Sequence, residues 1–250
     1  MFNKVRRALN PSKSLDPLQY LPLEIAEMIC HNLAVRERVT TLTHVKFLHL
    51  KGSRLAGAGT WPMLPKLKSL CLKAEGDYLL DVSELAKATS GVMSVALKGW
   101  RLQNIHGIED WTALQDLDLS NTEFSLLPML PATLRRLILR DSRQLEGFNI
   151  PEDSFWVNEV LEASIKHGKL RVLSIGNRLV HEPGHMSAAQ WAEEFPLSLT
   201  LRELSLAASL LDEAGLMRVV QGYPHLRVLD VSYTNVTGVA VKRFVKILMR

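Results

Sequence analysis

The amino-acid sequence predicts an α/β solenoid, in which a curved parallel sheet forms the concave face and loops and helices form the convex face. Two observations support this prediction. First, the pattern L-x-x-L-x-L, with Val or Ile at some apolar places, occurs eight times in the 250 residues. Second, the central apolar residue returns every 20 to 36 residues. Since no such unit can bury its own apolar face, each must stack on its neighbours.

Each copy of the pattern predicts one short strand whose leucines point inward. Alternate side chains of a strand face opposite sides of the sheet, so the residues between the leucines point outward. This spacing is typical of leucine-rich repeats and assigns residues 45–250 to one domain of about eight repeats. The central apolar residues are Leu48, Leu70, Val95, Leu117, Leu137, Leu173, Leu204 and Leu229.

The longer units predict helices on the convex side. Residues 151–168 begin with a proline, continue with acids and end with a glycine, which are helix start and stop signals. Residues 212–224 and 187–195 have similar patterns. Residues 237–250 predict a C-terminal capping helix with Val239, Phe244, Val245 and Leu248 on one face. The units before residue 150 show no such pattern, so we expect them to return as irregular segments.

Composition indicates an intracellular protein that does not span a membrane, either nuclear or cytoplasmic. The chain is 47% hydrophobic with a formal net charge of +4, and no run approaches the ~18 apolar residues of a membrane helix. Both cysteines, Cys30 and Cys71, sit in apolar patterns, as expected in a reducing compartment. Residues 1–14 are basic and free of acids, which predicts a disordered leader or a mitochondrial transit peptide.

Residues 15–44 contain the sequence "LPLEIAEMICHNL", which predicts an amphipathic helix. It resembles the first half of an F-box. The positions that carry this resemblance are Leu21, Pro22, Glu24, Ile25, Ile29 and Leu33. In the F-box family such positions pack against the Skp-type adaptor of a cullin–RING ubiquitin ligase. The segment from Ala34 to His44 is too short for the two further helices of a complete box, so the F-box would be shortened.

An F-box followed by leucine-rich repeats implies a non-enzymatic substrate-recognition subunit of an SCF-type ubiquitin ligase. The repeats would then bind the target protein. The sequence "LRVLDVSYTNVTGVAVKRFV" also resembles the closing repeats of fungal F-box/TPR/leucine-rich-repeat proteins. The alternative is a leucine-rich-repeat scaffold with no ubiquitin role, in which residues 15–44 only cap the array.

Basic residues follow the last apolar position of four of the first five repeats, namely Lys51, Lys73, Lys98 and Arg140. In a parallel sheet these side chains stack on the concave face at intervals of ~4.8 Å. The column predicts a track for an acidic or phosphorylated target segment, moderated by Asp116 and Asp118. The alternative is a solvated face. Nucleic acid is not expected, because no aromatic residues interleave with the cations.

Arginine follows the first leucine in four consecutive units, as Arg135, Arg171, Arg202 and Arg227. We expect a structural role for them, with the side-chain stems laid along the apolar edge. The sequence has no nucleophile elbow, glycine-rich phosphate loop or metal-binding cysteine spacing. His181 and His185 in "HEPGH" are separated by a helix-breaking Pro-Gly pair, which disfavours a metal site. We therefore expect no catalytic residues, metal or cofactor.

Overall fold

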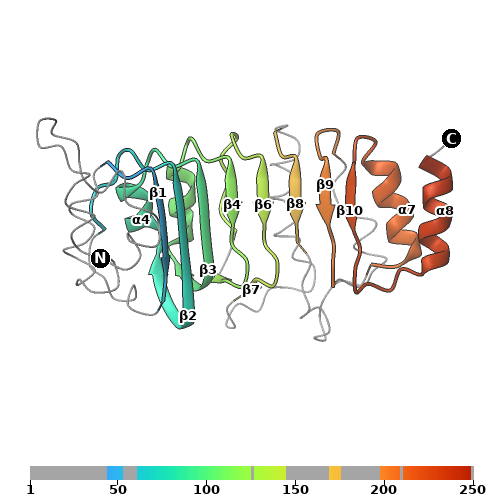
Figure 1. The fold of residues 1–250 in the computed structure, drawn as a ribbon, viewed down its shortest axis with the longest axis horizontal. Coiled ribbons are helices and arrows are strands. Elements are labelled where there is room, and N and C mark those ends of the chain that lie inside the picture. Colours follow the sequence, from blue (N-terminus) through green and yellow to red (C-terminus); the bar gives the residue numbers. More distant parts are fainter. Residues whose placement is uncertain are drawn as a thin grey trace, which may run out of the picture.

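The computed structural model describes residues 44–52, 61–124, 127–144, 169–175, 198–208 and 211–248, which form an elongated array of strands (Figure 1). The predicted leader, the F-box-like helix and the helices predicted at 151–168 and 187–195 lie outside these ranges.

The ten described strands form one parallel sheet. Eight of them follow one another along the array in the order β1, β2, β3, β4, β6, β8, β9, β10. Their bounds are β1 Phe47–Lys51, β2 Ser69–Asp81, β3 Ser94–Gln103, β4 Asp116–Asp118, β6 Arg136–Ile138, β8 Val172–Ser174, β9 Glu203–Ser205 and β10 Val228–Asp230. Each strand therefore belongs to one sequence repeat.

The register of the sheet agrees with the sequence pattern. Leu48 pairs with Leu70, and Leu70 pairs with Val95. The same column continues through the central residues of the other five repeats to Leu229. All of these side chains are buried except Leu229 in the last strand, which is half-buried. The predicted α/β solenoid, with its inward-facing leucines, is confirmed.

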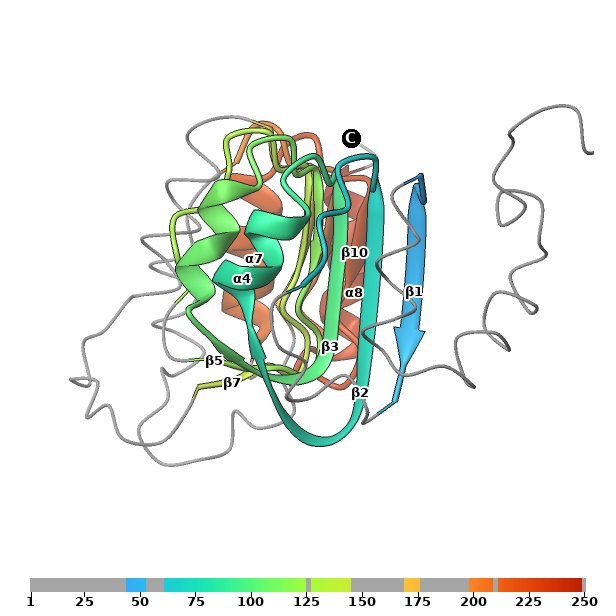
Figure 2. The same ribbon diagram turned by 90° about the vertical axis from the view of Figure 1, so that its left-hand side faces the viewer.

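Four helical segments are described. They are α4 (Val82–Ala88), the 3₁₀ helix η3 (Ile105–Asp110), α7 (Glu213–Gly222) and α8 (Gly238–Leu248). Figure 2 shows α4 and α7 on the same side of the sheet. α8 packs against α7 at the C-terminal end of the array (Figure 1). We call the opposite side of the sheet, formed by the outward-pointing residues of the strands, the open face.

The expectation that the units before residue 150 lack helices is wrong, because α4 follows β2 directly. The Asp81 side chain caps α4 by accepting a 3.1 Å hydrogen bond from the Glu84 backbone N–H. Val82, Leu85 and Ala86 are buried, and α4 packs against η3. A helix of seven residues makes only about two turns, so its apolar period is too short to stand out in the sequence.

A residue with positive φ lies two residues after the last apolar position of the pattern in six of the seven repeats that the structure describes there. It is Gly52, Gly99, Asn121, Asp141, Ala208 or Tyr233, with φ between 55° and 124°. The left-handed conformation turns the chain away from the strand direction at this point. The repeats thus share a corner, although only two of the six use glycine there.

β2 and β3 continue past this corner and form a second, short ladder. The pairing shifts between Lys73 and Tyr78 and then resumes from Tyr78 with Trp100 to Asp81 with Gln103. The strands β5 (Glu123–Phe124) and β7 (Arg143–Gln144) extend this ladder, since β5 pairs with both β3 and β7. Figure 2 shows β5 and β7 at the lower corner of the array, apart from the main ladder.

Candidate functional site

The open face carries three columns of outward residues. The register places Phe47, Ser69, Ser94, Asp116, Arg136, Val172, Glu203 and Val228 in the first column. The second contains His49, Cys71, Ala96, Asp118, Ile138, Ser174, Ser205 and Asp230. The face therefore mixes apolar side chains with charges of both signs.

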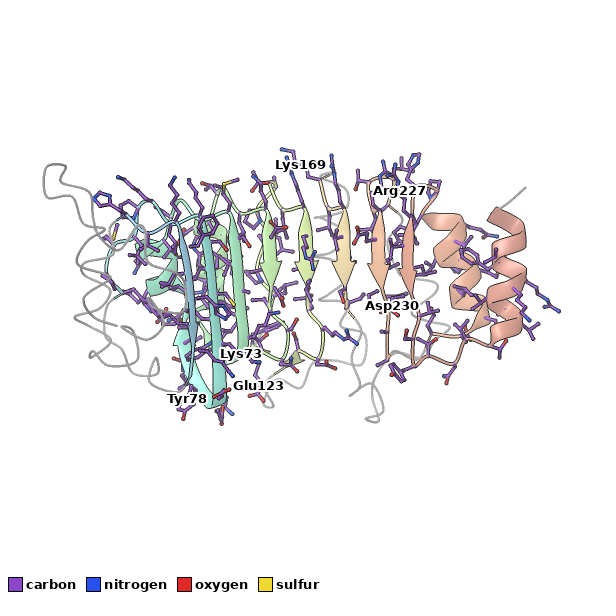
Figure 3. All side chains as sticks on the ribbon, viewed as in Figure 1. Lys73, Tyr78, Glu123, Lys169, Arg227 and Asp230 are labelled. Carbon is purple, nitrogen blue, oxygen red and sulfur yellow. The ribbon has the colours of Figure 1, made fainter. Side chains whose placement is uncertain are left out.

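The third column begins with the predicted cations. Lys51 pairs in register with Lys73, and Lys73 with Lys98. Arg140 lies two residues after Ile138, at the equivalent place of the fifth repeat. Figure 3 shows Lys73 toward the lower end of β2, near the corner. The structure thus brings the predicted cations together along the C-terminal ends of the strands.

Carboxylates of the chain itself pair with three of these four cations. Lys51 Nζ lies 2.8 Å from Glu75 Oε1, and Lys98 Nζ lies 2.6 Å from Asp118 Oδ2. Arg140 Nε lies 3.9 Å from Asp141 Oδ2. Lys73 is exposed and has no ion pair among the described residues. A target anion at this column would have to compete with the internal carboxylates everywhere except at Lys73.

The pKa shifts favour the ionised forms of Lys51, Glu75 and Asp118. The hydrogen bond with Glu75 raises the pKa of Lys51, and the same bond lowers the pKa of Glu75. Burial acts to raise the pKa of Asp118, but hydrogen bonds from Lys98 and Ser120 outweigh it and hold the pKa below its usual value. The paired cations are thus partly neutralised before any ligand arrives.

Two aspartates of the second column form the same turn. The backbone N–H of Ser120 donates to Asp118 Oδ1 at 3.0 Å, and that of Ser232 donates to Asp230 Oδ1 at 3.0 Å. The hydrogen bond from the Ser232 hydroxyl lowers the pKa of Asp230. Partial burial acts in the opposite direction, but the pKa remains below its usual value. Figure 3 shows Asp230 on the last strand. These carboxylates stabilise the turns at the ends of the strands.

A second row of charge lies at the opposite ends of the strands. The residue immediately before each strand is Lys46, Lys68, Met93, Gln115, Arg135, Arg171, Arg202 or Arg227. Each member after Lys46 donates its backbone N–H to the carbonyl of the preceding member, at 2.7 to 2.9 Å. Six of the eight side chains are therefore cations held in one hydrogen-bonded row. We call this row the basic rim.

The basic rim has no ion pair among the described residues. Arg202 is half-buried and donates to the His225 carbonyl at 3.2 Å, which fits the expected structural role. Arg135, Arg171 and Arg227, in contrast, are exposed. Figure 3 shows Arg227 and Lys169 projecting at the edge opposite to Lys73. Aligning Lys46 and Lys68 with the four arginines would have revealed the rim from the sequence.

The other predicted features either lie outside the described residues or show no reactive or metal-binding group within them. The adaptor-binding residues Leu21, Pro22, Glu24, Ile25, Ile29 and Leu33, and the "HEPGH" sequence, lie outside it. Cys71 is half-buried, and burial raises the pKa of its thiol, which disfavours the reactive thiolate. The described residues contain no cluster of three or more metal-binding side chains. They also contain no helix long and apolar enough to span a membrane.

Comparison with known proteins bears on the repeats. Podocan-like protein 1 of Mus musculus, a leucine-rich-repeat protein, is 29% identical to this chain over 195 residues. The fold is a leucine-rich-repeat solenoid. The match covers 73% of this chain but 34% of the mouse protein, so the chain spans about a third of the length of that relative. No protein-family model matches the chain. The likeness supports the repeats and does not extend to an F-box.

Proposed function

We propose that this chain is a protein-binding repeat scaffold that presents its open face to another protein. The observation that supports the proposal most directly is the continuous sheet of repeats, whose central apolar residues are buried in all but the last repeat and whose outward columns face away from α4 and α7. Stacked repeats create extended surfaces of this kind, which suit the binding of other proteins.

The composition of the open face favours a protein ligand. Phe47 is 71% exposed and Val228 is 52% exposed, at the two ends of the first column. Between them lie Asp116, Arg136 and Glu203, which carry both signs of charge. Protein interfaces combine apolar anchors with a mixed polar surround, whereas a nucleic-acid backbone requires clustered cations.

The test is a capture experiment followed by a binding measurement. Partners retained by the wild-type chain would be identified, purified and titrated against a Phe47→Ser, Arg136→Glu, Val228→Ser variant. We expect the affinity of a true open-face partner to fall at least about tenfold, because both anchors and a central charge are removed. Lys87→Glu on α4, an exposed position on the opposite side, is the control. Partners bound equally by both variants would contradict the proposal.

We further propose that residues 15–44 dock a Skp-type adaptor, which would make the scaffold a substrate-recognition subunit of a cullin–RING ubiquitin ligase. The sequence observation that favours this role is the F-box-like set Leu21, Pro22, Glu24, Ile25, Ile29 and Leu33 ahead of leucine-rich repeats. The direct test is a pull-down with purified adaptor, comparing the wild type with a Pro22→Ala, Ile25→Asp variant of equal thermal stability. Docking is supported if the wild type binds the adaptor and the variant does not. A folded wild type that fails to bind leaves a scaffold without a ubiquitin role.

A further inference from the structure

We propose that the basic rim binds an acidic segment of a partner protein, lying across the strands near their N-terminal ends. The inference rests on the proposed protein-binding function and names the chemistry of a ligand for it. It also moves the binding of acidic groups away from the predicted column of Lys51, Lys73 and Lys98, to the opposite end of the strands.

The geometry of the rim is set by the backbone. The N–H of Arg171 donates to the Arg135 carbonyl at 2.7 Å, that of Arg202 to Arg171 at 2.8 Å, and that of Arg227 to Arg202 at 2.7 Å. Neighbouring strands are ~4.8 Å apart, so these four arginines span ~14 Å. Alternate side chains of an extended peptide are ~7 Å apart. An extended segment of about five residues can therefore place several carboxylates over the row.

The rim differs from the column of Lys51, Lys73 and Lys98 in how many of its cations are paired with carboxylates of the described residues. Glu75 and Asp118 already contact Lys51 and Lys98. No carboxylate of the described residues lies within ion-pair distance of Arg135, Arg171 or Arg227. Guanidinium groups bind carboxylates through two parallel hydrogen bonds, which favours Arg wherever an acidic group must be recognised. Among the described residues, the rim arginines therefore make none of the charge-assisted contacts that Lys51 and Lys98 make internally.

Neighbouring apolar residues favour a protein segment over a nucleic acid. Met93, which is 36% exposed, occupies the third place in the rim itself. Leu199, three residues before Arg202, is 71% exposed. Apolar side chains gain from contact with apolar groups of a peptide but not from phosphates. The rim residues include no aromatic platform for stacking bases, which single-stranded nucleic acids prefer.

The experiment measures binding of a short fluorescein-labelled peptide rich in Glu with interspersed Leu, by fluorescence anisotropy. An Arg135→Gln, Arg171→Gln, Arg227→Gln variant removes three exposed rim cations. A Lys87→Gln, Lys242→Gln, Arg243→Gln variant removes three exposed cations from α4 and α8 and so has the same net charge. We expect the rim variant to weaken binding at least about tenfold and the control variant to change it less than about twofold. A peptide with Gln in place of Glu should not bind.

Several outcomes would overturn the inference. Failure of the wild-type protein to bind the acidic peptide would overturn it. An equal loss of peptide affinity in the rim variant and the control variant would also overturn it, because it would indicate attraction by net charge alone. A loss confined to a Lys51→Gln, Lys73→Gln, Lys98→Gln variant would return the site to the strand-end column. Tighter binding of an oligothymidine that the rim variant abolishes would identify a nucleic-acid site. If the rim variant still binds the protein partners captured by the wild type, the rim is not their binding site, but the proposed scaffold function stands.

Discussion

The backbone N–H of Arg171 donates a 2.7 Å hydrogen bond to the carbonyl oxygen of Arg135, and both side chains are exposed cations immediately before the adjacent strands β6 and β8. Sheet pairing therefore holds the backbones that carry these two like charges ~4.8 Å apart. Like charges directly opposite one another in a sheet are destabilising. No carboxylate of the described residues pairs with either arginine, so we expect their mutual repulsion to lower the stability of the fold.

This arrangement predicts that Arg171→Gln stabilises the protein at low salt. Arg171 lies between Arg135 and Arg202 in the rim, so removing its charge should raise the free energy of unfolding by ~0.2–1 kcal/mol by relieving repulsion with both neighbours. The gain should shrink at high salt, where the repulsion is screened. Urea denaturation at two salt concentrations measures both effects, with Lys242→Gln on α8 as the control. A loss of stability in Arg171→Gln at low salt would show that the rim side chains stabilise the fold.

The contact between η3 and α4 makes Gly107 sensitive to substitution. A Cβ atom at Gly107 would lie 2.5 Å from the Ser83 Cα and 2.7 Å from the Ser83 nitrogen. Because these are backbone atoms, the two segments would have to separate, and Gly107→Ala should cost about 1–3 kcal/mol of stability or more. Gly238→Ala is the matched control, because a Cβ there meets nothing within 4 Å. Thermal unfolding of the two variants checks this prediction, and equal melting temperatures would contradict it.

A buried hydrogen-bond chain links the second and third repeats. Trp111 Nε1–H donates to Thr89 Oγ1 at 3.0 Å, and the Thr89 hydroxyl donates to the Leu85 carbonyl at 2.7 Å. Thr89→Val would leave a buried indole N–H without its acceptor, so we expect a loss of about 1–3 kcal/mol. Combining it with Trp111→Phe should cost less than the sum of the two single changes, as for any interacting pair. Denaturant unfolding of all four proteins tests this, and strictly additive costs would refute the link.

The main ladder could be predicted from the sequence because two constraints coincide. Leucines at alternate positions must face the core, and a shift of one residue would expose all of them. Leu48, Leu70 and Val95 are therefore aligned by burial alone, and Lys51, Lys73 and Lys98 follow from them. The fixed spacing of leucines within each copy of the pattern sets the register, whatever the length of the loops between copies.

The sequence did not reveal which charges meet, since this depends on turns and bulges. Glu75 reaches Lys51 because β2 changes its pairing after Lys73. Asp77 and Glu123 meet Arg101 at 3.2 Å because β2, β3 and β5 continue around the corner. The sequence pattern revealed the four arginines of the rim but not its two lysines, for another reason. Lys46 and Lys68 align with the four arginines only when the residue before every strand is compared, and two of the eight repeats have Met93 and Gln115 there.

The carboxylate of Asp118 predicts a specific dependence of stability on pH. Its pKa in the folded protein is below its usual value of about 3.9, so the ionised form stabilises the fold above that pH. This contribution is lost as the pH falls through the folded pKa. Asp118→Asn should therefore be less stable than the wild type at pH 7, and the difference should narrow below about pH 4.

Urea unfolding of the two proteins at neutral and acidic pH measures this difference. Asp116→Asn, in the same strand, is the matched control for loss of one negative charge. Lys98 lies 2.6 Å from Asp118, so Lys98→Gln should remove part of the same contribution, while the hydrogen bonds from Ser120 retain the rest. A difference between wild type and Asp118→Asn that stays constant from neutral to acidic pH would mean that the carboxylate acts through its shape and neutral hydrogen bonding, not through its charge.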